Sequence, residues 1–176
     1  MADFATAAEL TSFIGGDAVG TRGTLMLTLA SAAIRRFTGQ TLDQVTGAQE
    51  EFGPSDLEAL FLTERPVTAV TEVEVNAVAI TDYVWTRWGT IRYSIDAAWS
   101  DGAIVTYDSG YAPASDEMVA VKSICLEAAA RAFTRDPTTG SETFGPQPEA
   151  IGWAPQIILT SEEQARLRDF GAVPVG

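Results

Sequence analysis

A long amphipathic helix, predicted for residues 114–136, constrains the fold more than any other part of the sequence. Ser115 suits the N-cap, where its hydroxyl accepts a hydrogen bond from an amide of the first turn. Asp136-Pro137 ends the helix, because proline lacks the amide donor that a further turn requires. The apolar side chains recur three and four residues apart and form one face: Met118, Val121, Ile124, Cys125, Ala128, Ala132 and Phe133. This face needs a cover, and we expect the strand-rich region upstream to pack on it.

Two helices are predicted before this central helix. Thr6 and Glu9 form a capping box at the start of the first helix, and Gly15 ends it. The second helix is predicted for residues 21–37, with Gly39 as its C-terminal stop. Its apolar stripe consists of Met26, Leu29, Ala30, Ala33, Ile34 and Phe37.

An antiparallel β meander is predicted for residues 60–108, between the second helix and the central one. Residues 67–75 contain valines close to alternating positions, which favours a strand with one dry face. Turn signals at Asn76-Ala77, Trp88-Gly89 and Ser100-Asp101-Gly102 separate this strand from those that follow. Glycine and proline repeatedly break residues 42–54, so we expect a loop there with at most one short strand.

The C-terminal segment, residues 137–176, is predicted to form an extended arm, because residues 138–155 are rich in Gly, Pro, Ser and Thr. Thr160 and Glu163 form a capping box that opens a short terminal helix. Large apolar side chains end the arm: Trp153, Ile157, Ile158, Leu159, Leu167 and Phe170. Two interpretations stay open, in which these side chains either dock on a neighbouring subunit or fold back on their own core.

The expected class is therefore α+β. Residues 1–136 would form a single domain, in which a small bundle of two N-terminal helices and one long central helix carries the inserted meander. The arm, residues 137–176, would extend from this domain.

Charge and composition exclude several functions. The net charge is −13 and the sequence pI about 4.2, without the basic stripe that proteins use to bind nucleic acid through its phosphates. The chain has no histidine, the commonest general base and transition-metal ligand. Cys125 is its only cysteine and reads as a buried structural thiol. No apolar run approaches the roughly 20 residues that span a bilayer, so we expect no membrane contact.

Paired carboxylates are the strongest candidates for chemistry. Glu72 and Glu74 alternate with valines and therefore share one face of a strand, as an acid/base or metal pair would. A solvated strand face explains the same pattern better. No nucleophile, phosphate loop or metal-ligand spacing accompanies them. We therefore expect no enzyme activity, no cofactor and no metal.

A further set of short segments is spread over most of the chain. They are residues 32–40 (AAIRRFTGQ), residues 62–70 (LTERPVTAV), Asp82-Tyr83, Gly89, Trp99, residues 105–111 (VTYDSGY) and residues 128–131 (AAAR). In order and spacing this set resembles the head-tail adaptor (connector) proteins of tailed bacteriophages, typified by the neck-ring proteins of long-tailed phages. One departure is Ser109, where a histidine often precedes the glycine in such proteins, and the family gives that position no catalytic role.

The resemblance implies a structural ring subunit of twelve copies that docks under the portal and links the DNA-filled head to the next neck or tail protein. It implies a place in the virion neck after assembly in the host cytoplasm. DNA would pass the channel without specific binding, because an acidic wall repels phosphate, and Glu72 and Glu74 are candidates for that wall. The alternatives are a head-closure (stopper) or tail-terminator subunit and, in a different class, a carboxylate-dependent hydrolase.

Overall fold

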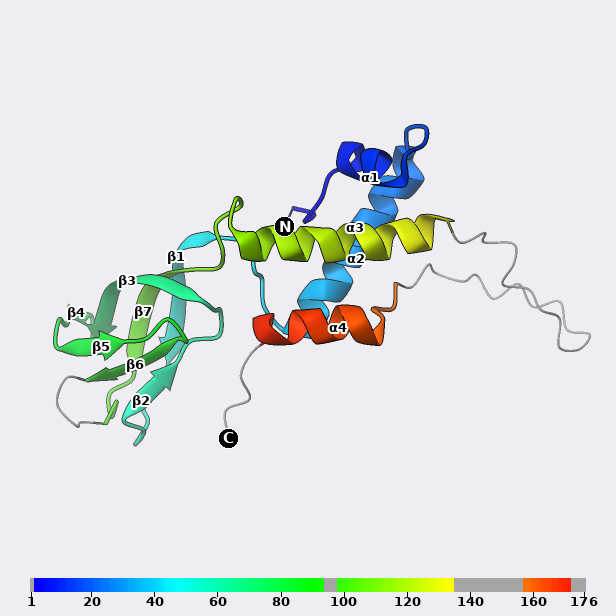
Figure 1. Ribbon diagram of the computed structural model, residues 1–176. Helices are drawn as coiled ribbons and strands as arrows, with labels where there is room; N and C mark the ends of the chain where they lie inside the picture. The colour runs from blue at the N-terminus through cyan, green and yellow to red at the C-terminus, as the bar shows by residue number, and fades with distance from the viewer. Residues whose placement is uncertain (1, 94–97, 135–156, 172–176) are drawn as a thin grey trace, which may run out of the picture. The chain divides into compact units, whose positions relative to one another are not determined.

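The computed structural model describes residues 2–93, 98–134 and 157–171 (Figure 1). The chain divides into two compact units. Unit 1 comprises Met1–Thr38 and Val119–Asp169, and unit 2 comprises Gly39–Met118 and Phe170–Gly176. Unit 1 is helical and unit 2 contains antiparallel sheets, so the α+β class is confirmed. The predicted boundary at residue 136 lies outside the described residues and stays a prediction.

The helices agree closely with the sequence predictions. They are α1 (Ala7–Ile14), α2 (Gly20–Thr38), α3 (Asp116–Thr134), α4 (Ser161–Leu167) and the 3-10 turn η1 (Arg168–Phe170). Capping boxes at Thr6 and Thr160 are both present. The Ser115 hydroxyl accepts a hydrogen bond from the backbone N–H of Met118 (3.2 Å), which confirms the N-cap of α3.

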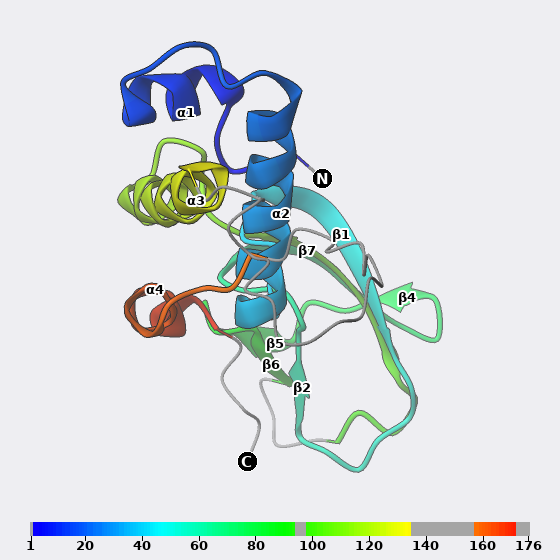
Figure 2. The same cartoon turned by 90° about the vertical axis from the view of Figure 1, so that its right-hand side faces the viewer.

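The core of unit 1 contains buried side chains from α1, α2, α3 and α4. Ser31 of α2 and Cys125 of α3 contact each other through Oγ and Sγ (3.5 Å), and both are fully buried. In both views α4 lies beside α2 (Figures 1 and 2). The buried apolar side chains are Leu10, Met26, Leu27, Ala30, Ile34, Val121, Ile124, Ala128, Ala129, Leu159 and Leu167. The apolar face of α3 therefore packs on other helices.

Within the described part of unit 2, seven strands form two sheets. They are β1 (Val45–Phe52), β2 (Ala59–Phe61), β3 (Val67–Val75), β4 (Val78–Ala79), β5 (Tyr83–Trp85), β6 (Thr90–Tyr93) and β7 (Ala103–Ser109). One sheet has the order β1-β7-β3-β4 and the other β2-β6-β5. Every strand pairing is antiparallel, but β7 lies between β1 and β3, so the expected simple meander is wrong in strand order.

Two further predictions about the strands need correction. Residues 45–52 form an eight-residue edge strand, where a loop with at most one short strand was expected. The sequence pattern did not predict this strand because it contains Gly47, which favours a turn. In the structure Gly47 has a φ of 65° at the point where the pairing with β7 shifts register. The strands also do not rely on α3 for cover, because both sheets share a core of their own. It consists of Leu60, Leu62, Val67, Val73, Ile91, Trp99, Ala103, Val105 and Tyr107.

Candidate functional site

Gln40, two residues after the end of α2, is a buried polar side chain that organises one corner of unit 2. Its Oε1 accepts a hydrogen bond from the backbone N–H of Arg65 (2.7 Å), and its Nε2 donates to the carbonyl oxygen of Thr63 (2.9 Å). The backbone N–H and hydroxyl of Thr41 donate to the Glu64 carboxylate, each over 2.8 Å. Residues 40–41 therefore hold the turn at residues 63–65 through four hydrogen bonds.

The end of β7 reaches the same corner. Gly110 donates its backbone N–H to the carbonyl oxygen of Pro66 (2.9 Å), and Tyr111 donates to that of Leu42 (2.9 Å). Three segments far apart in the sequence, residues 40–43, 63–67 and 107–111, thus meet in one place, which we call the Gln40 junction. Each overlaps or adjoins one of the stretches that carry the resemblance to phage adaptors. The structure gives these scattered residues a common role in holding unit 2 together.

Glu50 of β1 ties the junction to the sheet. Its carboxylate accepts hydrogen bonds from the backbone N–H (3.0 Å) and hydroxyl (2.7 Å) of Thr63 and from the phenol of Tyr107 (3.0 Å). Burial and then the neighbouring Glu50 charge raise the pKa of Tyr107. The phenol therefore remains a hydrogen-bond donor at neutral pH and is not available as a base.

A shallow depression of about 580 Å³, the Tyr111 groove, adjoins the junction. Its lining is mostly apolar or backbone: Pro66, Val67, Thr68, Trp85, Arg87, Gly110, Tyr111, Ala112, Ser115 and Glu117. Arg87 and Glu117 form an ion pair across 3.8 Å. Phe170 packs edge-on against the Tyr111 ring, with 5.7 Å between ring centroids. An open, mainly apolar surface with one ion pair suits contact with another protein segment.

Large apolar side chains outside the groove are also exposed on unit 2. Trp88, in the turn before β6, is 59% exposed. Others with more than a third of their surface exposed are Leu57, Phe61, Val78, Val84 and Ile104, and Trp85 of the groove is exposed to a similar extent. Aromatic side chains are enriched at protein interfaces because they bury a large area with few rotatable bonds.

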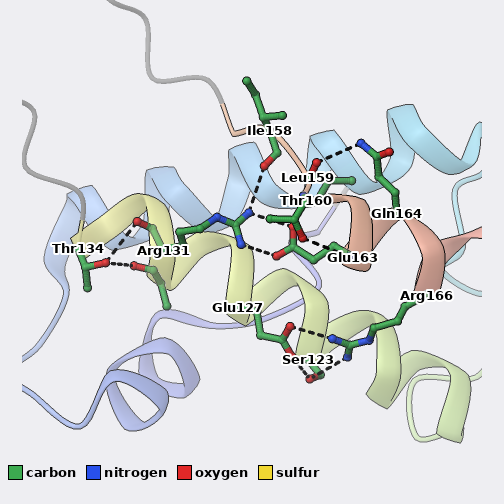
Figure 3. A network of polar contacts seen from close by, with 11 residues as sticks. Ser123, Glu127, Arg131, Thr134, Ile158, Leu159, Thr160, Glu163, Gln164 and Arg166 are labelled. Atoms are coloured by element: carbon green, nitrogen blue, oxygen red, sulfur yellow. Dashed lines mark hydrogen bonds and ion pairs between the residues drawn. The ribbon is translucent and has the colours of Figure 1, made fainter. Parts of the chain in front are cut away.

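In unit 1, a network of charged residues joins α4 to α3, as Figure 3 shows. The Arg131 guanidinium donates to both carboxylate oxygens of Glu163, over 2.6 and 2.9 Å, and also to the carbonyl oxygen of Ile158 (3.1 Å). One turn further along α4, Arg166 donates to Glu127 (2.8 Å). Burial alone would raise the pKa of Glu163, but Arg131 and the Thr160 backbone N–H hold it below its ordinary value. Glu163 is therefore charged at neutral pH although its side chain is only 4% exposed.

The arm residues proposed as partner contacts fall into three groups. Leu159 and Leu167 are buried within unit 1. Ile157 and Phe170 are half-buried. Trp153 lies outside the described residues. Contact of Leu159 or Leu167 with a partner would require α4 to leave this position, and their role as partner contacts stays a prediction. Ile158, by contrast, is 74% exposed.

The two candidate carboxylates lie on β3, on either side of the buried Val73. Glu72 is exposed and Glu74 half-buried. Their assignment to an acidic channel wall stays a prediction. Among the described residues, no group of three or more Cys, Asp or Glu side chains is placed to bind a metal ion. No helix in the described ranges combines the length and hydropathy of a membrane span.

Comparison with known proteins identifies a shared fold. No family model matches the sequence, and no curated protein matches it. The fold is similar to that of a chain in the neck of an empty gene transfer agent (GTA) particle computed with C6 symmetry. That match has a TM-score of 0.58 at 17% identity and covers 98% of this chain and 91% of that one.

Two further solved structures show the same likeness. A chain in the neck of a native GTA particle, computed with C12 symmetry, gives a TM-score of 0.54 at 15% identity and covers 97% of this chain and 90% of that chain. A chain in the virion of a native GTA particle gives 0.56 at 14% identity, with 98% and 91% covered. At these identities the similarity establishes the fold.

Proposed function

We propose that this protein is a structural head-to-tail adaptor subunit of a phage-type neck. Twelve copies would form a ring that docks under the portal and links the DNA-filled head to the next neck or tail protein. The subunit would assemble in the host cytoplasm and remain in the virion neck. It would act by shape and mutual contact, without catalysis.

The observation that carries this proposal is the similarity of nearly the whole chain, 97–98% of its length, to chains in GTA neck and virion structures. The two neck structures were computed with C6 and C12 symmetry, which supports self-association in a ring and suits a dodecamer. Three of the segments that resemble phage adaptors meet at the Gln40 junction. Their hydrogen bonds there stabilise unit 2, which explains why these short segments would occur in chains with this fold.

The exposed apolar side chains of unit 2 support a role in binding other proteins of the neck. The Tyr111 groove and the exposed Trp88 provide apolar area for neighbouring subunits or the next neck protein. The excess of acidic residues suits a channel through which DNA slides, because fixed negative charge repels phosphate. We assign Glu72 and Glu74 to that wall.

The direct test is assembly. The full-length chain, alone and mixed with the portal protein encoded in the same genome, is examined by light scattering after size exclusion and by negative-stain microscopy. We expect rings, formed either by the chain alone or on the portal, with about twelve subunits. An adaptor that needs the portal as a template would remain monomeric alone, so the mixture decides. Absence of any co-assembly with portal would overturn the proposal.

A second test separates the adaptor from other neck proteins. Particles produced without this protein should carry a portal but no further neck or tail components. A stopper would instead leave the adaptor ring in place beneath the portal, and a tail terminator would leave the whole head neck intact. Electron microscopy of the purified heads distinguishes these three outcomes.

A further inference from the structure

The position of α4 has an unusual combination of features. It is a helix of seven residues, too short to be stable by itself in water, so it forms only where it is docked. Its docked face consists of Glu163 and Leu167, continued by Leu159 just before the N-cap; the three are spaced four residues apart and are all at most 7% exposed. The remaining side chains of the helix are exposed or half-buried. The surface that receives this face, formed by α2 and α3, is called here the α4 seat.

The connection to α4 is much longer than the docked position requires. The carbonyl oxygen of Ile158 lies 3.1 Å from the Arg131 guanidinium, so the start of α4 is close to the end of α3. Packed helices are usually joined by roughly 2–8 residues. Here residues 135–156 join them, and a chain of that length spans up to roughly 70 Å when extended.

We infer that α4 exchanges between copies, so that the α4 of one subunit occupies the α4 seat of a second copy of this chain. Every contact in the seat is the same whether α4 comes from its own chain or from another, including the Arg131–Glu163 pair and the burial of Leu167. The preference for its own seat therefore depends on effective concentration, which decreases as the connection lengthens. Exchange of an identical element is a low-cost route to joining subunits.

The inference rests on the proposed function in one respect: a ring places the α4 seat of a neighbouring subunit within reach of α4.

The charges of the seat fit the α4 of a second copy of this chain. The seat presents Arg131 to a helix that brings Glu163, and Glu127 to a helix that brings Arg166, so each charge meets its opposite. A helix carrying the same two charges in the same order fits this seat, and the chain's own α4 has that sequence.

The test uses full-length chains with one cysteine each. In a Cys125→Ser background, one chain carries Glu127→Cys on α3 and a second, size-tagged chain carries Arg166→Cys on α4. These positions are in contact in the docked state, and each change removes only a partly exposed ion pair. The chains are mixed, brought to conditions in which the protein assembles, and treated with a short bis-maleimide. Exchange predicts a cross-chain product on a denaturing gel.

The matched control replaces Arg166→Cys by Ala165→Cys, which lies on the exposed side of α4. We expect roughly tenfold more cross-chain product with the Arg166 position, because only a docked helix holds that cysteine beside α3. Equal yields, or no cross-chain product, would overturn the inference. Light scattering on the same samples reports ring formation separately. Cross-chain product without rings would contradict the proposed function and support the exchange of α4. Rings without cross-chain product would support the proposed function and contradict the exchange.

A second variant tests the part played by the connection. Deleting residues 140–152 leaves about nine residues, enough to close over the chain's own α3 but spanning at most roughly 30 Å. We expect this deletion to reduce the cross-chain product severalfold while α4 stays docked in its own chain. An unchanged yield would show that the product arises without the reach of the connection and would contradict the proposed exchange.

Discussion

Gly110 and Asp43 lie so close together that a Cβ atom added to Gly110 would come within 2.1 Å of the Asp43 carbonyl oxygen. Gly110 also has a φ of 85°, in the left-handed region that favours glycine. The end of β7 can therefore meet the residues after α2 only because this position lacks a side chain.

The first prediction follows from this close approach. Gly110→Ala should destabilise unit 2 by about 2–4 kcal/mol, from the positive φ and the clash with the Asp43 backbone together. The control is Gly53→Ala in the same unit, where a Cβ would meet nothing within 4 Å. Urea unfolding followed by tryptophan fluorescence measures both. Equal stability of the two variants would show that the Gly110 contact does not constrain the fold.

The second prediction concerns the buried amide of the junction. Gln40→Ala should cost about 2–3 kcal/mol, because it leaves the Arg65 N–H and the Thr63 carbonyl without their side-chain partner. Gln49→Ala is the control, since that glutamine is exposed on β1 and should change stability by at most about 0.5 kcal/mol. Differential scanning calorimetry gives both values. A loss at Gln40 no larger than at Gln49 would contradict the central place of Gln40 in the junction.

Local patterns in the sequence were enough to predict many elements, and contacts between distant residues were not. The capping boxes at Thr6 and Thr160 and the Asn76-Ala77 turn depend on neighbouring residues, so their patterns are sufficient. Gln40 has no local signal, because its partners lie 23 and 25 residues away. Nothing near it in the sequence distinguishes it from an exposed glutamine.

The arm shows the same limit in another form. The sequence shows large apolar side chains near the end of the arm, among them Leu159 and Leu167, but it does not show which chain covers them. Glu163 was predicted as a capping residue, and it does accept the Thr160 N–H. Its ion pair with Arg131 depends on residues 32 positions apart and had no sequence signal. The structure places both leucines inside unit 1, which the sequence left open as one of two interpretations.

The third prediction compares the two ion pairs that hold α4. Arg131→Ala should free the helix, because it leaves the buried Glu163 carboxylate without its partner, at a cost of about 2–3 kcal/mol. Arg166→Ala removes a pair whose side chains are more than a third exposed and should cost at most about 0.5 kcal/mol. Hydrogen exchange of the α4 amides reports the difference. Similar protection of α4 in both variants would mean that Leu159 and Leu167 hold the helix without the ion pair.

The fourth prediction is a pH dependence in α1. The hydrogen bond from Lys122, and then the Thr6 backbone N–H, lower the pKa of Glu9 to about 2. A carboxyl group whose pKa is lower in the folded state contributes stability that is complete above its unfolded pKa, near 4.5, and is lost as pH falls towards 2. Because both side chains are over a third exposed, the contribution at pH 7 should be at most about 1 kcal/mol.

Comparing Glu9→Gln with the unsubstituted chain tests this sign. The difference in unfolding free energy should be largest near neutral pH and shrink as pH decreases from 5 to 2. In a Lys122→Met background the same substitution should have a smaller effect at neutral pH, since the main cause of the lowered pKa is gone. A difference that grows on acidification would contradict the assignment.

The fifth prediction uses the distribution of tryptophans between the units. Truncation after Asp136 removes Trp153 and α4, and the remaining tryptophans, Trp85, Trp88 and Trp99, all belong to unit 2. Loss of α4 uncovers the surface that Leu159 and Leu167 bury, so the helical unit should lose about 2–4 kcal/mol. Unit 2 has its own core and should stay folded, with the stacked Tyr93–Trp99 pair intact.

Thermal unfolding measures this difference. The helix signal in circular dichroism should be lost at a lower temperature than in the full-length chain, while the transition in tryptophan fluorescence should stay at the same temperature. If both signals moved together by the same amount, the two units would unfold as one, and α4 would support the whole chain.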